Sequence, residues 1–142
     1  MSAQGPGTFH IIDESMTGDY YLKILQQYLV QNGTELCGNE FVFQQDNHPA
    51  HKTKKIQDYM ERIGFQELAW PENSPDFSPI ENMFATLKRH VADRSPRSIE
   101  DLKSVTREEW MGMDADYTKA LVASMPARMQ AGKRAHGGAT RF

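Results

Sequence analysis

The sequence contains a single cysteine, Cys37, and this scarcity excludes two kinds of structure. A lone thiol forms no internal disulfide, and it cannot supply the several thiolates of a structural zinc site. An intracellular, reducing location is therefore expected.

Long apolar runs are also missing. No stretch approaches the ~20 apolar residues that a membrane-spanning helix needs. The first seven residues, Met-Ser-Ala-Gln-Gly-Pro-Gly, have neither the basic nor the apolar part of a signal peptide. We therefore expect no membrane partner.

An excess of positive charge is absent as well. The net charge is −3, so the chain is not an obvious binder of polyanions. The charge is uneven, however. Residues 1–45 hold one lysine and five acids, a net charge of −4, whereas residues 46–142 hold 15 Lys and Arg against 14 acids, a net charge of +1.

What the sequence does contain fits one globular unit. Hydrophobic residues make up 39% of the 142 positions and charged residues 25%, near the averages for folded domains. Residues 41–43, Phe-Val-Phe, predict a short buried strand, and apolar spacing along residues 19–32 predicts a helix that Asn32 and Gly33 end.

The whole pattern predicts an α/β fold. Strands are expected over residues 8–12, 41–45 and 65–69, and helices over residues 19–32, 53–63, 79–92, 99–110, 116–124 and 126–136. We expect one domain over residues 1–142, with a helical region from about residue 98 onward.

Two acids stand at informative places in this pattern. Asp46 follows the strand expected at 41–45, and Glu81 lies in the first turn of the helix expected at 79–92, with 34 residues between them. A fold can bring carboxylates at such places together around a metal ion. Hard divalent cations such as Mg²⁺ prefer carboxylate oxygens, which suits phosphoryl-transfer chemistry.

Each acid has a purely structural alternative. Ser78, Pro79 and Glu81 match a capping box, with serine at the N-cap and glutamate three residues later, and on local sequence alone capping is the better explanation. Asp46 followed by Asn47 is equally typical of a side-chain turn that leaves a strand. Both alternatives stay open at this point.

The residues around the two acids resemble those of a known family. Residues 44–51 read Gln-Gln-Asp-Asn-x-Pro-x-His, and residues 70–82 read Trp-Pro-x-x-Ser-Pro-Asp-x-x-Pro-Ile-Glu-Asn. These motifs, their 34-residue spacing and the flanks at 5–13, 18–21, 124–128 and 137–140 resemble the catalytic domain of mariner-superfamily cut-and-paste transposases. The resemblance covers nearly the whole chain.

The resemblance implies an RNase H-like domain with a DDE-type active site. Asp46 and Glu81 would be catalytic residues and ligands of two Mg²⁺ or Mn²⁺ ions, with Asn47, His51 and Asn82 in supporting roles. The implied reaction is metal-dependent phosphoryl transfer: water nicks the transposon ends, and the freed 3′-hydroxyl then attacks target DNA.

The same resemblance implies DNA partners, namely transposon ends and a TA target, and a nuclear location. The candidate DNA contacts are basic residues near the two acids: Lys52, Lys54, Lys55, Lys88 and Arg89. Their alternative is that such clusters are ordinary solvated helix faces.

The family pattern also predicts what this chain lacks. The family's first catalytic Asp and its helix-turn-helix region lie upstream of the segment resembled here, and neither Asp13 nor Glu14 aligns with that Asp. We therefore expect a partial catalytic domain without the first strands, inactive as an isolated fragment.

Two functions follow from this expectation, so enzyme activity of the chain itself stays open. The first is a transposase catalytic region for DNA transposition and integration, complete only in a longer protein or complex. The alternative is a non-catalytic transposon remnant that acts as a nucleic-acid-binding or protein-interaction module. Either form is expected to be able to self-associate or to pair with a full-length transposase.

Overall fold

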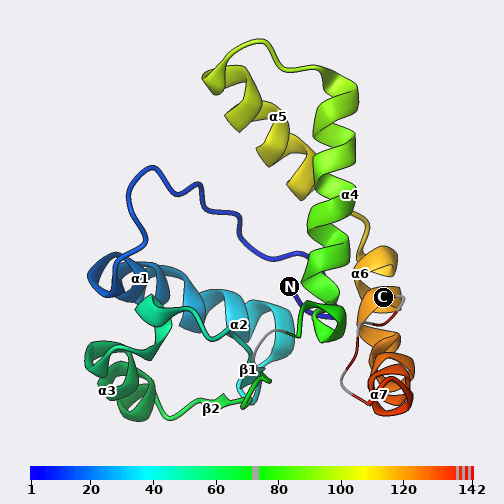
Figure 1. Ribbon diagram of the computed structural model, residues 1–142. Coiled ribbons are helices and arrows are strands. Elements are labelled where there is room, and N and C mark those ends of the chain that lie inside the picture. The colour runs from blue at the N-terminus through cyan, green and yellow to red at the C-terminus, as the bar shows by residue number, and fades with distance from the viewer. Residues whose placement is uncertain (72–73, 137, 139, 141) are drawn as a thin grey trace. The chain divides into compact units, whose positions relative to one another are not determined.

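The computed structural model describes residues 1–71, 74–136, 138, 140 and 142 (Figure 1). The chain divides into two compact units, each described below by itself. The first, called the strand unit, is His10–Asn73. The second, called the helical unit, combines Met1–Phe9 with Ser74–Phe142.

The strand unit is built on one long helix that packs on a second helix. Helix α1 (Gly18–Ile24) begins where the Thr17 side chain accepts a hydrogen bond from Tyr20 N, and it runs through a π-helical turn (Leu25–Leu29) into α2 (Val30–Cys37). Helix α3 (Lys54–Ile63) faces it and ends at Gly64. The core consists of apolar side chains from both: Tyr21, Leu25, Leu29, Ile56, Tyr59 and Met60.

The helix stop predicted at Asn32 and Gly33 is wrong, because the helix continues to Cys37. Gly33 has a packing role instead: a Cβ atom built at this position would overlap the ring of Phe41. The chain leaves the helix at Gly38, whose φ of 82° suits glycine.

The sheet contains two parallel strands, β1 (Val42–Phe43) and β2 (Gln66–Glu67), in the register Val42 to Gln66 and Phe43 to Glu67. They lie within the strands predicted at 41–45 and 65–69, and helix α3 connects them. The prediction that 41–43 is a buried strand is wrong, because Val42 is 51% exposed. Phe41 and Phe43 are half-buried and pack against the core of the strand unit.

The strand predicted at residues 8–12 is not formed. Among the residues that the structure describes, the only sheet is the β1–β2 pair, so no neighbouring strand bonds this segment. Side-chain contacts lie at this segment and at the residue before it. In the helical unit the indole of Trp110 donates to the backbone oxygen of Gly7 (2.8 Å), and in the strand unit His10 Nε2 lies 2.9 Å from the Tyr20 hydroxyl.

The helical unit contains the four helices predicted after residue 78, each with ends within two residues of the prediction: α4 (Pro79–Arg94), α5 (Ile99–Met111), α6 (Ala115–Ala123) and α7 (Met125–Arg134). Figure 1 shows α5 running back along α4. Their contact buries Met83, Leu87, Val91, Val105 and Trp110. No helix among the described residues combines the length and the apolar character that crossing a bilayer demands.

The role of Gly33 can be tested by whether one substitution raises or lowers the free energy of unfolding. Alanine favours helix over glycine by ~1 kcal/mol, so propensity alone predicts that Gly33→Ala stabilises the protein. The overlap with Phe41 reverses this, and we expect Gly33→Ala to lower the free energy of unfolding by ~1–3 kcal/mol in urea denaturation. In a Phe41→Leu background the loss should vanish. A stabilising effect with Phe41 present would contradict the packing role.

Candidate metal-binding carboxylates

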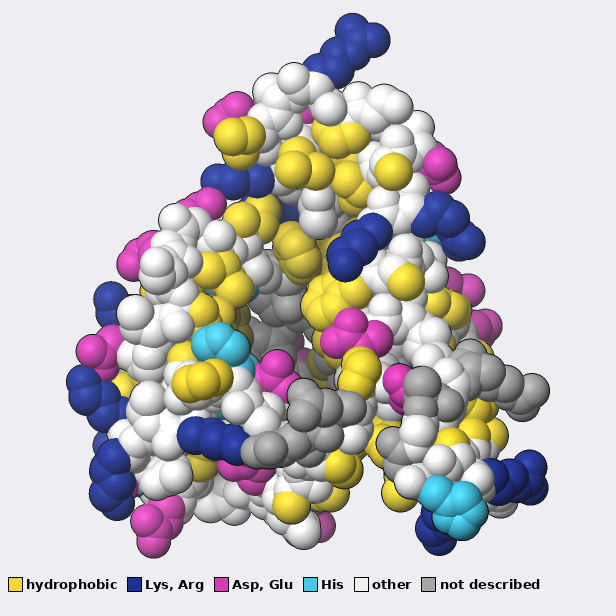
Figure 2. Space-filling model, in the orientation of Figure 1, with side chains coloured by type: hydrophobic (Ala, Val, Ile, Leu, Met, Phe, Trp, Pro, Cys, Tyr) yellow, Lys and Arg dark blue, Asp and Glu magenta, His cyan; other side chains and the backbone are white. Residues whose placement is uncertain are grey.

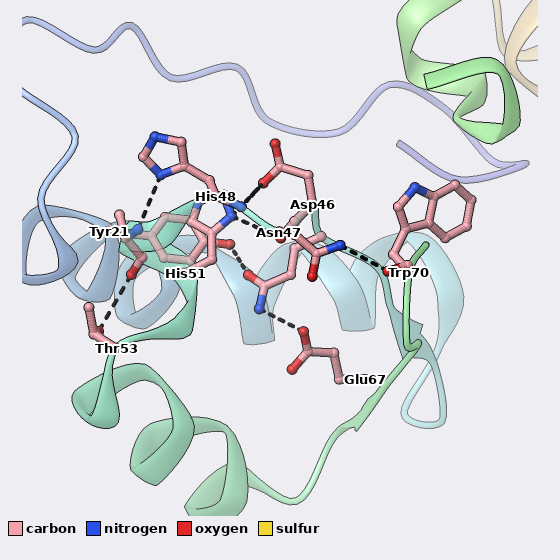
Figure 3. A network of polar contacts seen from close by, with 10 residues as sticks. Tyr21, Asp46, Asn47, His48, His51, Thr53, Glu67 and Trp70 are labelled. Atoms are coloured by element: carbon pink, nitrogen blue, oxygen red, sulfur yellow. Dashed lines mark hydrogen bonds and ion pairs between the residues drawn. The ribbon is translucent and has the colours of Figure 1, made fainter. Parts of the chain in front are cut away.

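Asp46 follows β1, and two groups orient its carboxylate (Figure 3). Its Oδ1 accepts a hydrogen bond from the backbone N–H of His48 (3.1 Å) and lies 2.7 Å from Nδ1 of His51. The side-chain turn considered from the sequence is therefore present. The Asp46 side chain is nevertheless 71% exposed, and among the described residues its Oδ2 has no recorded partner. The carboxylate is thus oriented through one oxygen and open at the other.

His51 is itself held in place by the core. Its ring stacks on Tyr21 of α1, with centroids 3.9 Å apart, and its side chain is 15% exposed. The Tyr21 hydroxyl donates to Gln45 Oε1 (2.5 Å), and Gln45 Nε2 donates to Glu67 Oε1 (2.8 Å). Burial, then the negative charges of Asp46 and Glu67, raise the pKa of Tyr21, so its hydroxyl stays a neutral donor.

Asn47 ties two loops of the strand unit together. Its side-chain amide donates to the backbone oxygen of Trp70 (2.9 Å), which connects the segment after β1 to the segment after β2. The bond fixes the chain next to Asp46. Sequence reasoning missed the role of Tyr21, which lies in the helix predicted at 19–32 but whose contact with His51 that pattern does not show.

Glu81 lies in the first turn of α4, and the capping-box interpretation of this residue is wrong. Ser78 is the N-cap, but its side chain makes no capping hydrogen bond, and its N–H donates to the backbone oxygen of Pro75 (2.8 Å) rather than to Glu81. The Glu81 side chain is exposed and has no recorded hydrogen bond or ion pair among the described residues. Its carboxylate is therefore available to a ligand.

Asn82, next to Glu81, is bonded on two sides. Its Oδ1 accepts from Nη2 of Arg128 (2.6 Å), and its backbone oxygen accepts from the Tyr117 hydroxyl (3.3 Å). Arg128 is only 2% exposed. The sequence placed Arg128 in a motif shared with the family, but nothing in its spacing showed a contact with a residue 46 positions away.

Asp76, the third acid near the motif, belongs to the 3-10 turn η3 (Pro75–Phe77) that precedes α4. Its Oδ2 accepts from the backbone N–H of Thr140 (2.5 Å), and its backbone oxygen accepts from Nη1 of Arg128 (2.8 Å). The hydrogen bonds from Thr140 hold the pKa of the Asp76 carboxyl below its usual value. Asp76 therefore has a structural task in this turn.

The candidate DNA-contacting residues differ in whether their charges are paired with acids. Lys54 pairs with Asp58 (2.6 Å) and Lys55 with Asp19 (2.5 Å). Lys52 lies at the end of a 3-10 turn, Pro49–Lys52. Lys88 and Arg89 of α4 are exposed, and neither has a recorded ion pair among the described residues. Figure 2 shows Lys and Arg interspersed with acids on the face in view.

The structure therefore gathers Asp46, Asn47 and His51 in the strand unit, and Glu81 and Asn82 in the helical unit. Carboxylate oxygens that are exposed and lack a full set of partners suit Mg²⁺ or Mn²⁺. Among the described residues, no group of three or more His, Cys, Asp or Glu side chains forms a metal cluster. The donors fit a divalent cation, and each unit supplies one acid.

Solved structures show which fold the chain adopts. A solved structure of the Mos1 transposase catalytic domain with Raltegravir and Mn matches 98% of this chain at a TM-score of 0.80 and 19% identity, and the chain covers 74% of that structure. The Mos1 paired-end complex with left transposon end gives a TM-score of 0.86 at 20% identity, over 98% of this chain and 42% of that one. The expected RNase H-like fold is confirmed.

The family follows from the sequence comparison. Residues 1–103 match the family described as DDE superfamily endonuclease, so the chain belongs to that family and is a transposase-related DDE endonuclease domain. It is 32% identical over 135 residues to the transposable element Tcb2 transposase of Caenorhabditis briggsae and 29% identical over 132 residues to the Tc1 transposase of Caenorhabditis elegans.

The two alignments cover 92% and 93% of this chain but 48% and 47% of the relatives. The chain thus spans about half the length of the curated relatives it matches. The resemblance to mariner-superfamily transposases is confirmed.

The lowered pKa of Asp76 gives a prediction with a definite sign. The folded-state pKa lies below the unfolded value of 3.8, so the carboxylate stabilises the fold fully above pH 3.8, and this stabilisation is lost as the pH falls through the lower folded pKa. Asp76→Asn should lower the melting temperature at about pH 6, and the difference from wild type should shrink towards about pH 2.5.

Thermal melts followed by circular dichroism would measure this. Asp93→Asn is the matched control, because Asp93 is exposed and has no recorded partner among the described residues. A difference for Asp76→Asn that stays constant over the whole pH range would contradict the role of the Thr140 bond.

Proposed function

We propose that this chain supplies Asp46 and Glu81 as carboxylate ligands for Mg²⁺ or Mn²⁺ in a DDE transposase that cuts and joins DNA. The main support for the proposal is the way in which the two carboxylate oxygens of Asp46 differ. One carboxylate oxygen is fixed by His51 and by the N–H of His48, and the other is open. Glu81 is likewise exposed at the start of a helix.

The proposed reaction is hydrolysis of a phosphodiester at a transposon end, followed by attack of the freed 3′-hydroxyl on target DNA. Bound divalent cations would polarise the phosphate and stabilise the charge that develops on the attacking and leaving oxygens. His51 Nδ1–H donates to Asp46 Oδ1 and so directs the other oxygen outward. Tyr21 prevents the imidazole from turning away, because the two rings are stacked.

DNA is the proposed partner, and the nucleus the proposed place of action. A solved relative is described as a Mos1 paired-end complex with left transposon end, which supports transposon-end DNA as the ligand of this family member too. Lys88 and Arg89 are the strongest candidates for phosphate contacts, because their charges are exposed and unpaired among the described residues. Lys52, Lys54 and Lys55 remain weaker candidates.

Metal binding by the chain itself would test the proposal. Mn²⁺ is paramagnetic, so titration should broaden the amide NMR signals nearest to Asp46 and Glu81 before all others. Asp46→Asn and Glu81→Gln should each remove the broadening at their own position, because a neutral amide is a poor ligand for a hard cation. Glu81→Gln should leave the melting temperature nearly unchanged, since Glu81 makes no capping bond.

Asp93→Asn, in which an exposed acid is removed elsewhere, is the control for non-specific attraction of Mn²⁺. Broadening that survives both site substitutions would contradict the ligand assignment.

We also expect no nick in a labelled terminal-repeat duplex from the 142-residue chain with Mn²⁺, because the described residues contain no three-ligand cluster. Nicking abolished by Asp46→Asn would show that a third ligand is present after all.

The two groups of basic residues should differ in their contribution to DNA binding. Lys88→Ala and Arg89→Ala should each reduce the slope of log affinity against log salt by about one, as the loss of one phosphate contact does. Lys54→Ala should change it less, because Asp58 already neutralises that lysine. Fluorescence anisotropy with duplex DNA at several salt concentrations would measure the slopes. A larger effect from Lys54→Ala would reverse the assignment.

A further inference from the structure

Arg128 is a buried cation whose recorded hydrogen bonds, among the described residues, all go to neutral oxygens, although the charge of the Asp76 carboxylate also acts on it. Its Nε donates to Ser124 Oγ (2.7 Å), its Nη1 to the backbone oxygen of Asp76 (2.8 Å) and its Nη2 to Asn82 Oδ1 (2.6 Å). None of the ion pairs recorded among the described residues includes it, and its guanidinium carbon lies 4.9 Å from the centre of the Phe142 ring. Burial lowers the pKa of Arg128, the direction expected when a charge leaves water.

Stability alone explains such a residue poorly. Removing a guanidinium from water is costly, and neutral oxygen acceptors return less than a carboxylate would. What the guanidinium provides is geometry, because its donors form a rigid planar fork. Its two Nη groups bond two different elements, η3 through the backbone oxygen of Asp76 and α4 through the side chain of Asn82.

The two residues that Arg128 holds, Asp76 and Asn82, lie on either side of Glu81 in the chain. Asp76 precedes the N-cap residue Ser78, and Asn82 directly follows Glu81. Fixing both sides fixes the angle at which α4 begins. Glu81 depends on this, because its own side chain has no recorded bond among the described residues, so its position follows from the backbone of the turn.

The chain from residue 124 onward holds the same turn at further points. Gly132 of α7 is buried under Phe77 of η3, so closely that a Cβ atom there would overlap the ring. The N–H of Thr140 donates to the Asp76 carboxylate. The preceding helix, α6, contributes as well: the Tyr117 hydroxyl donates to the backbone oxygen of Asn82 and bonds Thr86 Oγ1 (2.8 Å).

We propose that Arg128 is a positioning residue: through Asn82 and Asp76 it sets the direction in which the first turn of α4 presents the Glu81 carboxylate to a divalent cation. The proposal rests on the function proposed above for Glu81. It assigns the segment after residue 124 a task in the active site, although that segment contributes no acid to it.

The test compares substitutions at both ends of one hydrogen bond. Arg128→Met removes the fork, Arg128→Lys keeps the charge without the fork, and Asn82→Leu removes the acceptor while leaving Arg128 in place. Asn82→Asp keeps an acceptor oxygen and serves as the conservative variant that should restore function. Leu121→Ala, which trims the packing of the helical unit at a residue outside the turn, controls for a general loss of stability.

Two NMR readouts on the full 142-residue chain separate the outcomes. Without metal, amide exchange at Glu81, Asn82 and Met83 should accelerate in Arg128→Met, Arg128→Lys and Asn82→Leu beyond the change at Val105, and should not do so in Leu121→Ala. With Mn²⁺, the affinity read from broadening near Glu81 should fall ~10-fold in the same three variants and stay near wild type in Asn82→Asp. Broadening near Asp46 should be unchanged.

The failures can be told apart. If wild type shows no Mn²⁺ effect near Glu81, the proposed function fails, while the metal-free exchange still reports on the turn. If wild type binds Mn²⁺ there and Asn82→Leu binds it equally well, the positioning role is overturned and the proposed function stands. Should Arg128→Met fail to fold, Asn82→Leu and Arg128→Lys carry the decision. Equal losses in Leu121→Ala and Asn82→Leu would also overturn the inference, since they would indicate stability alone.

Discussion

The burial of Tyr21 is the constraint on which the site in the strand unit depends. One side chain belongs to the apolar core between α1 and α3, stacks under His51, and donates its hydroxyl to Gln45 beside the end of β1. The core therefore fixes the imidazole, and the imidazole fixes Asp46. An exposed carboxylate is usually mobile. Here it is oriented through a chain of contacts that begins with hydrophobic burial, which is the strongest force available to a small unit.

Most of the helices could be predicted because amphipathic spacing is a local property that tertiary packing reinforces. The buried residues of α3 and α4, such as Ile56, Met83 and Leu87, lie on the faces that the sequence indicates. The errors arise where a distant residue decides. Gly33 looks like a helix stop, but it lies within α2, and a residue without a side chain fits there because a Cβ atom would overlap the Phe41 ring. The segment at 8–12 has the composition of a strand, but a strand needs a neighbour to bond it.

The candidate site could likewise be predicted only in part from the sequence. Asp46 and Glu81 could be proposed from motif and spacing, because those are properties of the chain order. The two structural alternatives could not be decided from the chain order, and the structure decides them differently. The side-chain turn at Asp46 is formed and leaves one oxygen open, whereas the capping box at Glu81 is not formed, because the Ser78 N–H bonds Pro75 instead. The contacts of Arg128 with α4 and η3 were beyond local reasoning, since these two partners lie 46 and 52 positions away.

The two acids are thus positioned by different physical means. Side-chain bonds from His51 direct the Asp46 carboxylate, so a change at His51 acts on the orientation of one functional group. The Glu81 carboxylate has no such bond and takes its direction from the backbone at the start of α4, which Arg128 holds. A rotamer of Glu81 can therefore adapt to a ligand, whereas Asp46 is oriented beforehand.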